Sequence, residues 1–400
     1  MFKRGLVVIC LLMVTSIYGT RPFVSFSADS RLVTKPYNTK SVADATLFFY
    51  DATNMGYWYS IKQLSYFNRK AGFYTRAFLT GLIINNSFFQ VFSLPYKEFG
   101  HGSRGRAFGI EAQYKLDNQD KIFDTYYSLF GDILFNVKAH TMSETVKPNV
   151  FDIDVHSSVN TSDFDLIWYA GGVNNLMYLS QRIDDRFYDR NVTSVYDFLG
   201  FLSSKMAISH MDVSYLNNIK QVYNQKGMDM SISDFKRYNG YAVLSSFTFW
   251  SFVDGWSRYL VSGIDYIQYN EFKQLRMPDV SMYLTSHGPS YRVQSGYKWS
   301  TKMHVPVAIE YVFKGETQFE YTVGLSKTWS MLPIQTYSQI RLGEGFGMSQ
   351  LVTINLPYFS KLGFGLDYYD FNNLFGERHI PSLKKGNNDL SLWVSYSFRQ

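Results

Sequence analysis

The residues best suited to chemistry lie together in the run Pro95-Tyr96-Lys97-Glu98-Phe99-Gly100-His101-Gly102-Ser103-Arg104. Glu98 is a candidate general base, and His101 is a candidate general acid or metal ligand, because both side chains can exchange protons. Arg104, with glycines near it, is suited to a carboxylate or phosphate ligand. The alternative interpretation is a turn between strands with ordinary polar residues.

The same run resembles the zinc-protease motif H-E-x-x-H, in which two histidines one helical turn apart hold the metal and the glutamate activates water. Lys97 stands at the position of the first histidine, and a protonated lysine cannot bind zinc. The resemblance therefore does not by itself imply a protease. It leaves Glu98 and His101 as the candidate catalytic pair.

A second candidate site lies in residues 152–156. Asp152, Asp154 and His156 occupy every second position, so a strand would direct all three toward one face. Together with His101, they are the candidate ligands of a divalent cation. The polar inner face of a barrel would show the same pattern, so both interpretations stay open.

Gly171, Gly172 and Asn174 are candidate ligand-binding residues at the start of a helical region, as is Arg104 beside the first motif. Glycines let the backbone approach a ligand, but the favoured interpretation is that Gly171 and Gly172 break the preceding strand. The run Gly343-Glu344-Gly345-Phe346-Gly347 lacks the strand, turn and helix setting of a dinucleotide fingerprint. It predicts a turn between strands.

Most of the elements that must position these residues are predicted to be strands. Near the C-terminus an apolar residue occupies every second position, with serines at most of the places between: Leu390, Leu392, Val394, Tyr396 and Phe398. This pattern predicts a strand with one apolar face and one small polar face. Similar alternation recurs from Asp279 onward in segments of about ten residues, whose charged residues, such as Arg292, Lys298, Glu310 and Glu320, all lie on the non-aromatic side. Strict alternation also occurs at residues 106–116, and weaker strand signals occur at residues 23–27, 45–50 and 72–76.

The middle of the chain has a different periodicity. Residues 174–183, 195–210, 213–224 and 241–261 place apolar side chains three or four positions apart, which predicts helices. The expected organisation is therefore an N-terminal barrel segment (20–168), a helical insertion (169–265) and C-terminal barrel strands (266–400).

A terminal strand of this kind resembles the closing strand of bacterial outer-membrane β-barrels, whose aromatic end is read by the insertion machinery. The resemblance implies a transmembrane, antiparallel β-barrel in the cell outer membrane, with outer-membrane lipid and the barrel insertion machinery as partners. The strand signals predict about ten to twelve strands. A soluble β-sandwich also alternates, but its solvent face usually carries dense Lys and Glu, whereas here Ser, Thr, Gln and Gly are common.

Composition and the first residues agree with an exported membrane protein. Aromatic residues make up 18% of the chain and charged residues only 18%, below the roughly 25% usual for soluble domains. Residues 1–19 have the basic start, apolar run and small residues of a signal peptide. They contain the single cysteine, Cys10, so the mature chain is expected to have no disulfide. Removing Lys3 and Arg4 leaves 37 basic against 33 acidic residues, a balance that does not favour nucleic-acid binding.

Three functions are compatible with these patterns. The preferred one is a non-enzymatic outer-membrane barrel whose helical insertion plugs the lumen or projects into the periplasm, serving transport, assembly or attachment. The second is a membrane-embedded hydrolase, acting on lipid or peptide through Glu98 and His101 with a divalent cation. The third is a soluble periplasmic or secreted binding protein, which predicts extraction without detergent.

Overall fold

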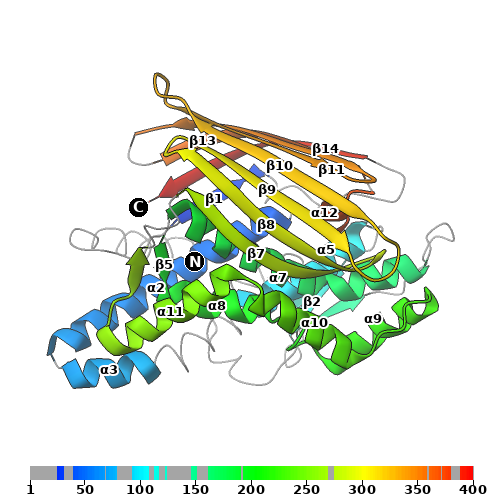
Figure 1. Ribbon diagram of the computed structural model, residues 1–400, viewed down its shortest axis with the longest axis horizontal. Coiled ribbons are helices and arrows are strands. Elements are labelled where there is room, and N and C mark those ends of the chain that lie inside the picture. Colours follow the sequence, from blue (N-terminus) through cyan, green and yellow to red (C-terminus); the bar gives the residue numbers. More distant parts are fainter. Residues whose placement is uncertain are drawn as a thin grey trace.

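The computed structural model describes residues 25–30, 39–67, 69–78, 92–107, 112–116, 122–123, 146–150, 161–190, 192–268, 274–357, 360–370, 372–379 and 388–399. Its main feature is a nine-stranded antiparallel sheet that arches over a layer of helices (Figure 1). In spatial order the strands are β1 (Ser25–Asp29), β14 (Asn388–Arg399), β13 (Ser360–Asp370), β12 (Phe346–Asn355), β11 (Ile334–Leu342), β10 (Phe319–Thr328), β9 (Met303–Val312), β8 (Gly288–Ser300) and β7 (Leu275–Thr285).

Period-two alternation gives this sheet two unlike faces. Side chains on the outer face, which points away from the helices, are apolar and exposed, as Val307, Val323 and Leu325 are. Their neighbours along the strands are buried and polar, as Glu310 and Thr322 are. Short turns fix the register, and at the β9–β10 turn Gly315 has a φ of 113°, a conformation that favours glycine.

The helices fill the concave side of the sheet. They are α2 (Thr39–Phe67), α3 (Arg69–Phe78), α5 (Leu94–Ala107), α7 (Thr161–Arg190), α8 (Val195–Lys205), α9 (Val213–Gln225), α10 (Ile232–Leu244), α11 (Phe247–Ser262) and α12 (Leu374–His379). Two small sheets accompany them, formed by β2 (Ala112–Leu116), β3 (Ile122–Phe123) and β4 (Val146–Val150), and by β5 (Val192–Ser194) and β6 (Tyr266–Gln268). Among the helices in these ranges, none is both long and apolar enough to span a bilayer.

The apolar core lies between the helices and β7. Its buried members include Tyr96 of α5, Leu179 of α7, Phe201 of α8 and Tyr283 of β7. Local signals start two of these helices: Asp212 accepts from the N–H of Ser214 at 2.7 Å, and Ser231 and Asp234 form a reciprocal capping box. The core is therefore helix on helix and helix on edge strand, while the outer face of the sheet takes no part in it.

The expectation of an antiparallel sheet combined with helices is confirmed. The sheet, however, is open, because β1 and β7 lie at its two edges in the described residues and do not pair with each other. The helical insertion was expected at residues 169–265, and helices α7 to α11, which run from Thr161 to Ser262, occupy most of this range.

Several expected N-terminal strands were wrong. Residues 45–50 lie in α2 and residues 72–76 lie in α3. Val42, Thr46 and Tyr50 are buried four residues apart, which is a helical spacing, and a short apolar run cannot distinguish the two structures. Of the strand expected at residues 106–116, residues 112–116 form β2, whereas residues 106 and 107 belong to α5 and residues 108–111 lie outside the described ranges. The motif with Glu98 and His101 is thus helical and is not a turn between strands.

Candidate functional site: a charged cavity under the sheet

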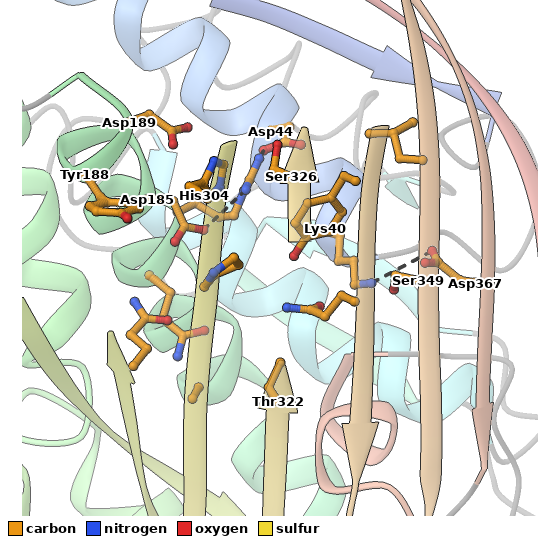
Figure 2. Close-up of a pocket in the computed structure, with 18 of the residues that line it drawn as sticks. Lys40, Asp44, Asp185, Tyr188, Asp189, His304, Thr322, Ser326, Ser349 and Asp367 are labelled. Carbon is orange, nitrogen blue, oxygen red and sulfur yellow. Dashed lines mark hydrogen bonds and ion pairs between the residues drawn. The ribbon is translucent and has the colours of Figure 1, made fainter. Parts of the chain in front are cut away.

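A cavity of about 530 Å³ lies between the inner face of the sheet and helices α2 and α7 (Figure 2). A volume of this size can hold a small organic molecule. Its lining is mostly polar and comes from strands β7 to β14, from α2 and α7, and from Phe375 of α12. The cavity is the strongest candidate site in the described part of the chain because many charged side chains meet there.

Charged pairs form the helical wall of the cavity. Arg182 of α7 donates to Asp44 of α2 at 2.7 and 2.9 Å and to Asp185 at 3.4 Å. Arg276 of β7 also donates to Asp185, at 2.7 Å. Burial acts to raise the pKa of the Asp185 carboxyl, but the guanidiniums of Arg276 and Arg182 hold it below its ordinary value. Asp185 is therefore an anion that ties α7 to the sheet through Arg276, while Arg182 ties α7 to α2 through Asp44.

Lys40 makes the second bridge between the helices and the sheet. Its ammonium lies 3.8 Å from the carboxylate of Asp367 on β13 and donates to the hydroxyl of Tyr369 at 2.8 Å (Figure 2). It also lies 4.9 Å from the ring centre of Phe375, within the range of a cation–π contact. The N-terminal end of α2 is thus fixed to the far strands of the sheet.

A buried cluster of arginines and glutamates adjoins the cavity on the sheet. Glu310 of β9 accepts from both terminal nitrogens of Arg378, one of them at 2.7 Å. Glu320 of β10 lies 3.4 Å from Arg341, and Arg292 lies 3.8 Å from both carboxylates. Arg292 and Arg341 line the cavity. A paired and hydrogen-bonded arrangement is what burial of so many charges requires.

Glu98 and His101 lie outside this cavity, inside the contact between α5 and α7. His101 is fully buried, its Nδ1 lies 2.8 Å from the carbonyl oxygen of Trp168, and its ring stacks on Tyr215. Burial lowers the pKa of His101 to about 3, and the ammonium of Lys97 acts in the same direction. The ring is therefore neutral, and Nδ1 carries the proton that is donated to Trp168. Glu98 is also buried, with a carboxylate oxygen 3.4 Å from Lys97.

Arg104 has a protein partner where an anionic ligand was expected. Its guanidinium is buried and donates to the carbonyl oxygen of Glu377 in α12. Burial lowers the pKa of Arg104 to about 9. The Glu377 carboxylate in turn accepts from the N–H and the hydroxyl of Ser286, both at 2.8 Å. Arg104 thus joins α5 to α12 and, through α12, to the end of β7.

Gly171 and Gly172 lie within α7, so the expectation of a broken strand was wrong. A Cβ at Gly100 of α5 would lie 2.4 Å from the carbonyl oxygen of Gly171, and a Cβ at Gly172 would lie 2.4 Å from Nε2 of His101. These distances are too short for any side chain. The glycines allow α5 and α7 to cross closely, and this packing explains them without a ligand.

Asn174 satisfies the free edge of β7. Its side-chain amide donates to the carbonyl oxygen of Leu284 at 2.7 Å and accepts from the N–H of Leu284 at 3.0 Å. Ser246 does the same further along, accepting from the N–H of Val280 at 3.1 Å. Helical side chains therefore take the place that a further strand would have at this edge.

Asp152, Asp154 and His156 lie outside the described residues. Within the described ranges, no group of three or more histidine, cysteine, aspartate or glutamate side chains is placed to hold a metal ion. The divalent cation therefore stays a prediction from the sequence.

Sequence analysis missed the helical wall of the cavity. The signal was present in the run Gln181-Arg182-Ile183-Asp184-Asp185-Arg186, which places two arginines and two aspartates in the C-terminal third of α7. So many charges within a helix that also carries buried apolar residues indicate a polar stripe facing something charged. On the strand side, Arg292 was correctly assigned to the polar face, whereas Arg341 was not singled out.

Comparison with family models, with curated proteins and with solved structures found no match to this chain.

Proposed function

We propose that this chain is an outer-membrane protein whose curved sheet faces lipid and whose helices fill the concave side as a plug. The observation that carries the proposal is the polarity of the sheet, which is apolar on the exposed face and charged on the buried face. A soluble protein of one sheet and one helical layer buries the apolar face against the helices. Here the apolar face is exposed and the charged face is covered by the helices, an arrangement that is favourable when hydrocarbon surrounds the exposed face.

The exposed apolar residues are arranged in bands. Aliphatic side chains occupy the middle of the strands, as Val307, Val323 and Ile340 do in direct cross-strand contact. Exposed aromatic residues gather at both ends of the strands: Trp299, Trp329 and Tyr396 at one end, and Tyr311, Phe319 and Phe346 at the other. Aromatic belts around an aliphatic band are typical of membrane-spanning sheets.

Strand length also supports the proposal. Strands β7 to β14 have 9 to 13 residues each, and a tilted strand needs about 9–11 residues to cross a bilayer. The proposed membrane wall is an incomplete barrel. Asn174 and Ser246 satisfy β7 at one edge, so that this edge does not depend on pairing with β1.

Among transport, assembly and attachment, the cavity favours the handling of a small polar solute. It lies under the membrane-facing sheet and is lined by charges from both the sheet and the plug. The C-terminal strand β14 would be the element that the insertion machinery reads, as the sequence resemblance implies.

The hydrolase alternative has no specific observation in its favour. Glu98 and His101 are buried in the α5–α7 contact, and among the described residues that line the cavity none comes from α5.

Extraction from cells tests the proposal. Expressed with its first residues, the full chain should sediment with the outer-membrane fraction, resist a high-salt and an alkaline wash, and enter solution only with detergent. A soluble periplasmic protein used as a control should appear in the osmotic-shock fluid. Finding the chain in that fluid without detergent would remove the outer-membrane assignment and favour the soluble binding protein.

A further inference from the structure

Two arginines of the sheet converge on one hydroxyl in the wall of the cavity. Nη2 of Arg292 donates to Oγ1 of Thr322 at 3.3 Å, and Nη1 of Arg341 donates to the same oxygen at 3.4 Å. All three residues line the cavity, and Figure 2 shows Thr322 on a strand of the sheet wall, which is β10. Two like charges are therefore held close together at a surface that a ligand can reach.

The buried cluster behind this point has an excess of positive charge. It contains Arg292, Arg341 and Arg378 against Glu310 and Glu320, and every member is at most 5% exposed at its side chain. Arg378 donates hydrogen bonds to both carboxylate oxygens of Glu310. Arg292 is left 3.8 Å from the nearest carboxylate oxygens, which is beyond hydrogen-bonding distance. A buried cation without a hydrogen-bonded anion is costly, so this cluster favours a further negative charge.

The same arginines also have hydrogen-bond donors to spare. Within the described residues, Nε and Nη1 of Arg292 and Nε of Arg341 have no hydrogen-bond acceptor. Thr322 accepts from both guanidiniums, which leaves its own hydroxyl hydrogen to donate. Buried donors of this kind are normally satisfied. A ligand oxygen would supply the acceptor.

The two walls of the cavity differ in charge. The sheet contributes four cations and one anion: Arg276, Arg292, Arg341, Lys361 and Asp367. The helices contribute two cations and three anions: Lys40, Arg182, Asp44, Asp185 and Asp189. An anion is therefore attracted to the sheet side, where Arg292 and Arg341 lie.

We propose that the cavity binds a small oxyanion, with a carboxylate or phosphate group seated against Arg292, Thr322 and Arg341. Planar guanidiniums match both groups in geometry and charge. The inference takes the solute-handling role proposed above and names its ligand class. It does not depend on the membrane assignment, because binding can be measured on protein kept in detergent.

Titration calorimetry of the purified full chain provides the test, with inorganic phosphate and succinate as probes at constant ionic strength. We expect saturable binding of at least one probe, weakened about tenfold or more in R341Q, because a charge-assisted hydrogen bond is lost. E320Q should bind several-fold more tightly, because it removes a competing negative charge while its amide oxygen still accepts. R258Q changes an exposed arginine on α11 and should leave binding unchanged.

The opposite signs of the two variants separate a binding role from a structural one. If Arg341 and Glu320 only held the sheet together, both variants would weaken binding alike, and that result would overturn the proposal. Absence of saturable binding of both probes to the unaltered chain would overturn it too. If circular dichroism shows that R341Q does not fold, E320Q and T322V test the proposal in its place. We expect tighter binding in E320Q and weaker binding in T322V. A chain that binds phosphate but is extracted without detergent would keep this inference and lose the membrane assignment.

Discussion

Replacing Val323 with lysine places a charge at the centre of the outer face. Val323 is the fifth of the ten residues of β10 and lies between Val307 and Ile340 on the neighbouring strands. At about 3.4 Å per residue the strand is about 34 Å long, and a tilt of about 45° reduces its height to about 24 Å. This height matches the apolar band of outer-membrane proteins, about 25 Å tall, so Val323 would lie near the bilayer midplane.

The expected cost of this substitution differs strongly between lipid and water. At the midplane of a bilayer a lysine on the lipid face destabilises the folded state by about 2–4 kcal/mol, which is about 30- to 1,000-fold in the folding equilibrium constant. In water the cost would be within about 0.5 kcal/mol, as for most surface substitutions, because the Val323 side chain is already 55% exposed. The two cases are therefore separable by equilibrium unfolding.

The assay is reversible urea unfolding of the full chain reconstituted in lipid vesicles, followed by tryptophan fluorescence. V261K is the matched control, because Val261 is 82% exposed on α11, away from the sheet. We expect V323K to lower the free energy of unfolding by about 2–4 kcal/mol and V261K to change it by less than about 0.5 kcal/mol. Equal, small effects of both variants in vesicles would show that Val323 does not face hydrocarbon.

Three further predictions concern the helices. G100A should destabilise the fold by about 1–3 kcal/mol, because the new Cβ would lie 2.4 Å from a carbonyl oxygen of α7. In the control G240A no atom lies within 4 Å of the new Cβ, so this variant should be neutral or stabilising by up to about 1 kcal/mol. If the midpoint of thermal unfolding shifted in the same direction in both variants, the close crossing of α5 and α7 would be contradicted. The pKa of His101 is about 3 in the folded chain and about 6.5 in the unfolded chain, so the unfolded state takes up the proton first, and stability falls as pH drops below about 6.5, by up to about 1.4 kcal/mol per pH unit. In H101Q the free energy of unfolding, measured with urea between about pH 5 and 7, should depend less steeply on pH, by up to the contribution of one proton. An unchanged pH dependence would show that His101 is not held neutral. N174A leaves two backbone groups of Leu284 without their partner, at about 1–3 kcal/mol each, so amide exchange at Leu284 should accelerate; unaltered protection would show that the edge of β7 does not need Asn174.

The strands of the C-terminal half could be predicted because one physical signal sets them. Alternation over about ten residues specifies both the strand and its two faces, and Arg292 and Glu310 fall on the buried polar face as expected. The outer face needed no information from distant residues, because Val323 and its cross-strand neighbours Val307 and Ile340 stay exposed in the described chain. Where structure depends on local periodicity alone, the sequence is sufficient.

The candidate site depended on contacts that no local pattern contains. Lys40 and Asp367 are 327 positions apart and meet only because α2 lies under β13. The sequence around Glu98 and His101 suggested a catalytic site. In the structure, Gly100 of this motif instead allows α5 to pack closely against Gly171 of α7, a contact that the sequence does not reveal. Whether the sheet is open or closed likewise depends on a distant contact, because Asn174 of α7 satisfies the edge of β7.

Whether Val323 contacts lipid decides whether the outer face of the sheet lies in a membrane. A fluorophore attached to V323C, in a C10S background, would be measured in vesicles whose lipid chains carry bromine at defined depths, with a label at V261C as the control. We expect strong quenching of the Val323 label that is greatest for bromine near the bilayer centre, and little quenching at Val261. Quenching at Val323 no stronger than at Val261 would contradict it, because the apolar face of the sheet would then not be in contact with hydrocarbon.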